Sequence, residues 1–133
     1  MKLTAYAVED IPANRLVCLV RPTDAEEDKI YIRLAKSDER PDFYSKRDIT
    51  AGEEVAVELE DSPVWMVEMA DDIPAGTSIS TGPEGRAVHM SNSEVMAKST
   101  IGYTLNAAKA GEVVKFRHIY KVKPWVLAGG DNQ

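Results

Sequence analysis

A short turn-forming phrase recurs four times in this chain and constrains its fold more than any other feature. Each copy ends in Gly or Asn, and two copies carry Pro at their centre. Pro presets φ for a turn, and Gly or Asn tolerates the left-handed conformation that closes one. An aliphatic or β-branched run follows each copy, so the phrase predicts turns that lead into strands. The copies are Asp10-Ile11-Pro12-Ala13-Asn14, Asp48-Ile49-Thr50-Ala51-Gly52, Asp72-Ile73-Pro74-Ala75-Gly76 and Ala107-Ala108-Lys109-Ala110-Gly111. Their uneven spacing does not fit the identical stacked units of a solenoid.

Alternation of apolar and polar residues predicts the strands themselves. Val55, Val57 and Leu59 alternate with charged residues, which is the period of a half-buried strand. Residues 78–90 predict a β-hairpin around Gly82-Pro83-Glu84-Gly85, and residues 91–98 predict one or two helical turns. We therefore expect an all-β fold with little helix, a small antiparallel β-barrel or β-clip (β-tulip-like) domain of about eight short strands. The predicted core contains Val55, Val57, Leu59, Ile79, Val114 and Phe116.

Length and composition fit one domain. The chain has 133 residues, of which 44% are hydrophobic, and this is enough for a single core. We expect one β-rich domain over residues 1–133, with an N-terminal arm or edge strand at 1–8 and a C-terminal tail at 124–133. No apolar run reaches the roughly 18 residues of a membrane span, and residues 1–10 do not form a signal-peptide core. We expect a chain made in the cytosol, with no membrane contact.

The charge pattern favours protein partners over nucleic acid. The formal net charge is −6, whereas contact with phosphates requires a cationic field. Basic residues nevertheless gather near the C-terminus at Lys115, Arg117, Lys121 and Lys123. This strip suits contact with acidic protein surfaces, including other copies of the chain, although an ordinary solvated face explains it equally well.

The sequence shows no motif typical of an enzyme or a metal site. His89, His118 and Cys18 fall on separate predicted strands, and the acidic run 24–28 lacks the ligand spacing of a calcium loop. No Gly-rich phosphate loop or strained Gly-x-Ser-x-Gly turn occurs. Cys18, within an apolar run, is better explained as a small buried hydrophobe than as a reactive thiol. We expect no catalysis, no cofactor and no metal.

The second half of the chain resembles the capsid decoration (cement) proteins of tailed bacteriophages. The resemblance covers residues 72–116, from an Ile-Pro-Ala-Gly turn through a Gly-x-x-Gly-Arg-Ala-Val hairpin to the closing segment Thr100–Val114, with a weaker match at residues 7–20. It implies a small β-rich protein that binds the major capsid protein on the outer face of the virion and reinforces the shell. Phrase Asp72–Thr77 also resembles the turns of antifreeze-like (SAF, β-clip) domains, which implies the alternative of a small-ligand or carbohydrate-binding module.

The resemblance to decoration proteins implies that function depends on contact surfaces. Edge strands are often shared between copies at a symmetry axis, so we expect trimers, with dimers as the second possibility. The candidate contacts lie in the predicted arm and near the C-terminus, where Trp125 suits an interfacial anchor. They are Lys2, Leu3, Tyr6, Lys121, Lys123 and Trp125. Frayed termini are the simpler explanation of both segments, and the irregular stretch 35–48 is the next candidate surface.

Overall fold

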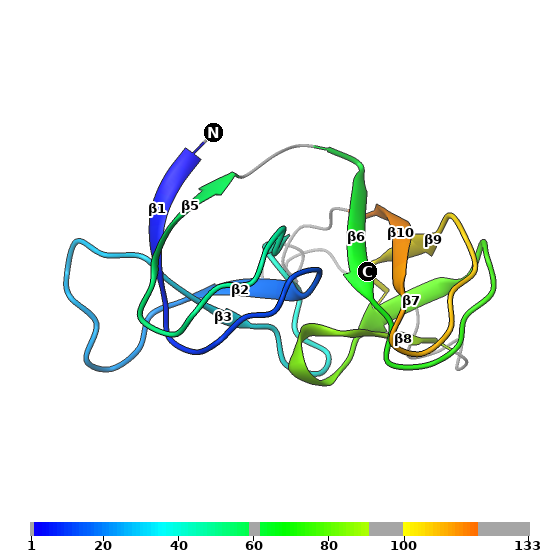
Figure 1. The fold of residues 1–133 in the computed structure, drawn as a ribbon, viewed down its shortest axis with the longest axis horizontal. Coiled ribbons are helices and arrows are strands. Elements are labelled where there is room, and N and C mark those ends of the chain that lie inside the picture. Colours follow the sequence, from blue (N-terminus) through cyan, green and yellow to red (C-terminus); the bar gives the residue numbers. More distant parts are fainter. Residues whose placement is uncertain (1, 59–61, 91–99, 120–133) are drawn as a thin grey trace, which may run out of the picture.

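Two five-stranded β-sheets make up the fold (Figure 1). The computed structural model describes residues 2–58, 62–90 and 100–119. The first sheet has the order β4-β2-β3-β1-β5 and the second has the order β6-β10-β9-β7-β8. The strands are β1 (Lys2–Ala7), β2 (Leu16–Val20), β3 (Tyr31–Leu34), β4 (Phe43–Tyr44), β5 (Glu54–Glu58), β6 (Val64–Glu68), β7 (Ser78–Thr81), β8 (Ala87–His89), β9 (Gly102–Thr104) and β10 (Val113–His118). The predicted all-β class is confirmed, and within the described ranges the helical content is one short 3₁₀ turn, Pro83–Gly85.

The two sheets are built from two copies of one structural unit. In the first repeat, β1 pairs antiparallel with β5, and β2 pairs with both β3 and β4. In the second repeat, β6 pairs antiparallel with β10, and β7 pairs with both β8 and β9. Strands β1, β2, β3, β4 and β5 therefore correspond to β6, β7, β8, β9 and β10, respectively.

The four turn phrases explain this duplication, because they lie side by side in two pairs. Ile11 and Ile49 exchange two backbone hydrogen bonds of 2.8 Å, and Ile73 and Ala108 exchange equivalent bonds of 2.8 and 3.0 Å. The leading aspartate of each pair then accepts a backbone N–H from the partner turn. Asp10 Oδ1 accepts from Ala51 at 2.8 Å, and Asp72 Oδ1 accepts from Ala110 at 2.9 Å. In each repeat, two turns that are far apart in sequence are thus hydrogen-bonded to each other.

The closing residue of every phrase has the predicted left-handed conformation. The φ values are 61° at Asn14, 84° at Gly52, 73° at Gly76 and 87° at Gly111. An L-residue with a Cβ rarely adopts this region, apart from Asn and Asp. The phrase therefore ends in Gly or Asn because the backbone requires it.

The predicted N-terminal arm is wrong, because β1 is an inner strand of the first sheet. It lies between β5 and β3, with Leu3 opposite Val57 and Tyr6 opposite Tyr31. Ala5 and Ala7 are fully or almost fully buried. Because alanine side chains are small, the segment is only weakly hydrophobic in sequence, although it pairs with a strand on each side. The pairing of β1 with β3 is parallel, so the sheet is not purely antiparallel as predicted.

The sheets pack around two clusters of buried side chains. Every predicted core residue within the described ranges is buried, namely Val55, Val57, Ile79, Val114 and Phe116, whereas Leu59 lies outside those ranges. Leu16 and Cys18 of the first repeat belong to the core cluster of the second repeat, so the repeats share a core. Glu68 adds a polar link between them, because its carboxylate pairs with Arg15 at 3.5 Å and with Arg86 at 2.8 Å. The predicted helical turns at 91–98 and the tail at 124–133 lie outside the described residues.

The second repeat is a closed ring of strands. Met69, directly after β6, forms a parallel bridge with Ala87 of β8, and the Ala70 N–H donates to the Ala87 carbonyl at 2.8 Å. The sheet order then returns from β8 to β6. Closure on the other side depends on Gly102 of β9, where a Cβ would collide with the backbone oxygen of Arg117 and lie 2.7 Å from Phe116 Cδ2. Glycine at this position lets β9 and β10 approach each other.

An ion pair fixes the start of segment 35–48. Arg33 Nη1 and Nη2 donate to Glu39 Oε1 and Oε2 at 2.7 and 2.8 Å, and the Lys36 N–H also donates to Oε1 at 2.7 Å. Hydrogen bonding to Arg33 is the main reason that the pKa of Glu39 falls from its ordinary 4.5 to about 2, and the Lys36 N–H lowers it further. A carboxyl group with a lowered pKa stabilises the fold above its unfolded pKa and ceases to do so as the pH falls through its folded value.

We predict that Gly102→Ala destabilises the protein by about 1–3 kcal/mol, the usual cost of overpacking a core position. Chemical denaturation measures the free energy of unfolding. Tyr103→Ala is the control, because Tyr103 is the exposed neighbour on the same strand. Equal stability of the Gly102→Ala variant and the parent would show that β9 and β10 do not need glycine to pair.

We predict that the Glu39 carboxyl titrates at about 2, and that part of the stability of the protein is lost between pH 4.5 and that value. NMR titration of the side-chain carboxyl carbon measures the pKa. Glu39→Gln should reduce the decline of stability across this range, whereas Glu27→Gln in the exposed acidic loop should leave it unchanged. A Glu39 pKa near 4.5 would contradict the paired geometry.

Candidate functional site

The seam between β4 and β5 distinguishes the first repeat from the second, and it is the candidate binding site. In the second repeat the equivalent strands form a ladder, with Thr104 opposite Phe116 and Gly102 opposite His118. The residues that the structure describes contain no such ladder between β4 and β5. Figure 1 shows β1 and β5 together on one side of the molecule and β9 and β10 together on the other. Within the described ranges, the second repeat is therefore closed by a ladder that the first repeat lacks.

Phe43 gives a steric reason for the open seam. It faces Val17 on β2, just as Gly102 faces Ile79 on β7, so Phe43 occupies the position of Gly102 in the repeat. The second repeat has no room for even a Cβ at this position. A phenylalanine here excludes the close approach through which β9 and β10 pair.

Arg47 gives a second, chemical reason why β4 and β5 do not pair. Its counterpart Asn106 accepts the Lys115 N–H through Oδ1 at 2.9 Å and donates from Nδ2 to the Ala107 carbonyl at 2.9 Å. Arg47 keeps the second bond, since Nη1 donates to the Asp48 carbonyl at 2.9 Å. A guanidinium has no acceptor, however, so it cannot bind the N–H of the opposite strand. Its Nη2 instead pairs with Glu53 Oε2 at 2.7 Å.

A cavity of about 300 Å³ occupies the open seam. Its floor is apolar, because Phe43, Ile49, Val55 and Val57 are all buried members of the first core cluster. Its lining residues are Phe43, Tyr44, Ser45, Lys46, Arg47, Ile49, Val55, Ala56 and Val57. Ala56 corresponds to Lys115, whose N–H bonds across the closed seam, so the Ala56 N–H points into the open one. A strand edge above an apolar floor can accept an extended peptide segment.

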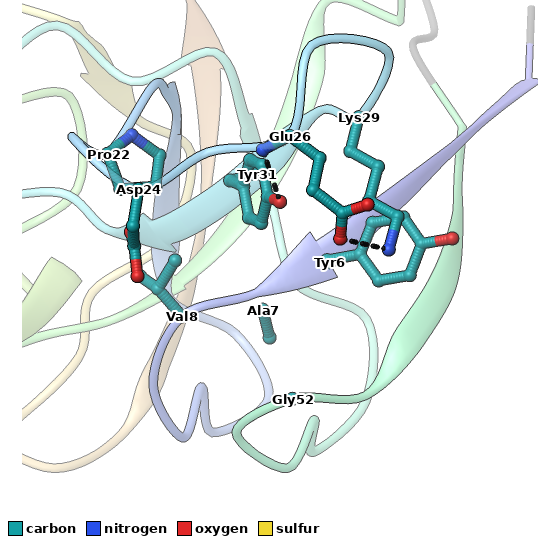
Figure 2. Close-up of a pocket in the computed structure, with 9 residues that line it drawn as sticks. All are labelled: Tyr6, Ala7, Val8, Pro22, Asp24, Glu26, Lys29, Tyr31 and Gly52. Carbon is teal, nitrogen blue, oxygen red and sulfur yellow. Dashed lines mark hydrogen bonds and ion pairs between the residues drawn. The ribbon is translucent and has the colours of Figure 1, made fainter.

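A second cavity, of about 540 Å³, lies beside Tyr6 and Tyr31 (Figure 2). The two rings are 6.1 Å apart, and the Lys29 ammonium lies 4.6 Å from the centre of the Tyr6 ring and 2.7 Å from Glu26 Oε2. The Tyr31 hydroxyl accepts the Glu26 N–H at 3.1 Å. These groups bind one another, and Lys29 covers one face of the ring on which a sugar would stack. The alternative of a carbohydrate-binding module stays a prediction that this geometry does not favour.

The predicted contact residues do not form one patch in the described part of the chain. Lys2, Leu3 and Tyr6 all lie on β1, but Leu3 packs against the first core cluster, whereas Lys2 and Tyr6 point to the opposite face. Lys2 is exposed and Tyr6 is half-buried. Lys121, Lys123 and Trp125 lie outside the described residues. Within β10, Lys115 and Arg117 are exposed and Val114 and Phe116 are buried, which confirms the predicted alternation.

The described residues contain neither a cluster of metal-binding side chains nor a readily ionised thiol. They contain no group of three or more His, Cys, Asp or Glu side chains that could hold a metal ion. Cys18 is buried as predicted, and burial raises the pKa of its thiol to about 12, with Glu39 and Asp42 adding to the effect. A thiol that stays protonated is a poor nucleophile. In the same part of the chain, no helix is long and apolar enough to span a membrane.

The seam was not predicted, although the sequence contains a signal for it. Superposing the two halves through their turn phrases places Phe43 on Gly102 and Arg47 on Asn106. A large side chain in place of a glycine that permits strand contact would have indicated a difference in closure. The uneven spacing of the phrases argues against a solenoid, but it is compatible with a duplication in which the phrases pair.

Comparisons with known proteins agree with one another. The family model described as head fiber protein matches residues 1–131. A head fiber protein of Bacillus phage Nf is 32% identical over 84% of this chain, and a capsid fiber protein of Bacillus phage B103 is 33% identical over the same share. The matched region makes up 40% and 36% of those two relatives, so the chain spans well under half of their length.

A solved structure shows the same fold. The crystal structure of the N base of the head fiber gp8.5 of bacteriophage phi29 superposes with a TM-score of 0.79 and 25% sequence identity. The match covers 90% of this chain and 93% of that one. The chain therefore belongs to the head fiber protein family of bacteriophages, whose members are structural proteins of the virion.

Proposed function

We propose that this chain is the base of a phage head fiber, which binds the outer surface of the capsid and stabilises the shell. The observation that carries the proposal is the fold, which matches a head-fiber N base over nine-tenths of the chain. The family match over residues 1–131 supports it. The chain would act by occupancy, without catalysis, and would be a component of the virion exterior that is made in the bacterial cytoplasm.

Repetition of identical sites gives a physical basis for such a role. A capsid presents each site many times, so a multivalent base can bind strongly through contacts that are individually modest. The partners would be the major capsid protein and other copies of the chain, and neither nucleic acid nor a membrane. The net charge of −6 agrees with the exclusion of nucleic acid.

The proposed contact residues remain those of the sequence analysis, with a changed role for β1. Lys2, Leu3 and Tyr6 would present a fixed strand instead of an extended arm, so Lys2 is the residue of the three most open to a partner. Lys121, Lys123 and Trp125 would form the second contact. Deleting residues 1–5 would not test binding, because it removes most of an inner strand of the first sheet.

We predict that the chain binds capsids that lack the head fiber and that it raises the temperature at which they rupture. Co-sedimentation measures binding, and thermal release of the genome measures stabilisation. Trp125→Ala should weaken binding at least tenfold, because removal of an interfacial Trp commonly costs about 2 kcal/mol or more. Lys109→Ala, in an exposed turn, is the matched control. Failure of the parent chain to bind or to stabilise capsids would refute the role.

We predict that the chain forms trimers in solution, with dimers as the second possibility. Sedimentation equilibrium measures the assembled mass, and a trimer of 14.7 kDa chains is the expected result. Sharing strand edges between copies would remove the exposed hydrogen-bonding groups that edges leave. A monomer at all accessible concentrations would contradict this prediction.

A further inference from the structure

The outer surface of the second sheet gathers exposed apolar side chains. Seven large hydrophobic side chains are exposed in the described part of the chain, and four of them lie on or directly after β6, β9 and β10. These four are Val64, Tyr103, Leu105 and Val113. Single exposed hydrophobic residues are normal on a protein surface, whereas a contiguous group of them marks an interaction site. The arrangement of the four on the sheet therefore decides what they mean.

Strand pairing brings these side chains together around β10. Arg117 lies opposite Val64 of β6 on one side and opposite Tyr103 of β9 on the other. Two residues back along β10, the Lys115 carbonyl accepts the Leu105 N–H at 2.8 Å. Residues that lie opposite each other in an antiparallel pair share a face, with Cβ atoms about 4.5–5.5 Å apart. They form one continuous surface, which we call the β10 face: Val64, Tyr103, Leu105, Val113, Lys115 and Arg117.

The β10 face is basic, although the net charge of the chain is −6. Lys115 and Arg117 are both exposed, and neither belongs to the ion pairs of the described residues. Glu68 of β6 points to the same side of the sheet, but its carboxylate pairs with Arg15 at 3.5 Å and with Arg86 at 2.8 Å. Two unpaired cations among apolar side chains complement a surface that combines carboxylates with apolar groups.

The first repeat shows that the fold does not require this composition. The positions equivalent to Val64 and Val113 hold Lys2 and Glu54, and both of these residues are exposed. The backbone register is the same in the two repeats, so polar side chains satisfy these outward positions. Apolar residues at the same positions of the second repeat therefore need a reason outside the fold, and burial against a partner supplies one.

We propose that the β10 face binds an acidic and partly apolar surface of the capsid shell protein, an inference that rests on the proposed function. Lys115 and Arg117 pair with carboxylates of the shell, while Leu105 loses its contact with water. Tyr103 and Arg117 are the central contacts, because Tyr and Arg are enriched among the residues that dominate interface energetics. A second copy paired across a two-fold axis is a poorer occupant, because it sets the cations of one β10 face against those of the other.

Exchange of outward residues between the repeats tests the proposal. The triple substitution Val113→Glu, Lys115→Ala and Arg117→Glu gives β10 the residues that β5 carries at the equivalent register positions. Its binding to capsids that lack the head fiber should be weaker by about tenfold or more. Binding of the parent should also weaken as salt is added, because salt screens exposed charges, whereas residual binding of the variant should depend less on salt. Glu54→Val, the converse change in the first repeat, is the matched control and should bind as the parent does.

Hydroxyl-radical footprinting of the parent chain keeps the test independent of how well the triple variant folds. Oxidation of Tyr103 and Leu105 should fall several-fold when the chain is bound to capsids. Ile30, which is exposed in the loop between β2 and β3, is the internal control and should be oxidised equally in the free and bound chains.

The outcomes separate this inference from the proposed function. Unchanged oxidation of Tyr103 and Leu105 in the bound chain would overturn the inference and leave the proposed function intact, and so would a folded triple variant that binds like the parent. Protection that appears without capsids as the protein concentration rises would assign the β10 face to another copy of the chain, which also overturns the inference. A parent chain that does not bind capsids would refute both proposals.

Discussion

Backbone hydrogen bonds between paired turns hold each repeat together, and the remaining structure depends on them. Ile11 with Ile49, and Ile73 with Ala108, join segments that are distant in sequence. Each pairing lies where the first strand of the repeat has ended and the last strand is about to begin, and so sets the register of β1 with β5 and of β6 with β10. Asp10 and Asp72 strengthen the joint by accepting an N–H from the opposite turn. Four copies of one short phrase therefore specify two copies of one fold.

Because the fold is duplicated, each strand pair of one repeat can be compared with its equivalent in the other. The second repeat shows what a completed ring looks like, with Gly102 and Asn106 bringing β9 and β10 together. The first repeat has the same strand connections and the same turns, yet Phe43 and Arg47 keep β4 and β5 apart. Among the described residues, the two copies of one unit therefore differ in whether these equivalent strands pair.

Much of the local structure was predictable from the sequence, and the reason is chemical. Alternation identified the buried faces of β5 and β10, and the turn phrases identified the four left-handed positions. The place of β1 was not predictable from the same signals. Ala5 and Ala7 are too small to mark a buried face, and only pairing with β3 and β5 on both sides makes that strand an inner one.

The sequence by itself determined the class of the fold, the turns and the core faces, because these depend on the conformational preferences of single residues and on alternation along one segment. Tertiary structure alone decided which turns pair, which strands are inner and which repeat closes. Those outcomes depend on contacts between residues far apart in the chain, such as the approach of Gly102 to Arg117. A local pattern contains no information about such a neighbour, so the exchange of Gly102 for Phe43 between the repeats acquires its structural meaning only from the contact between strands in space.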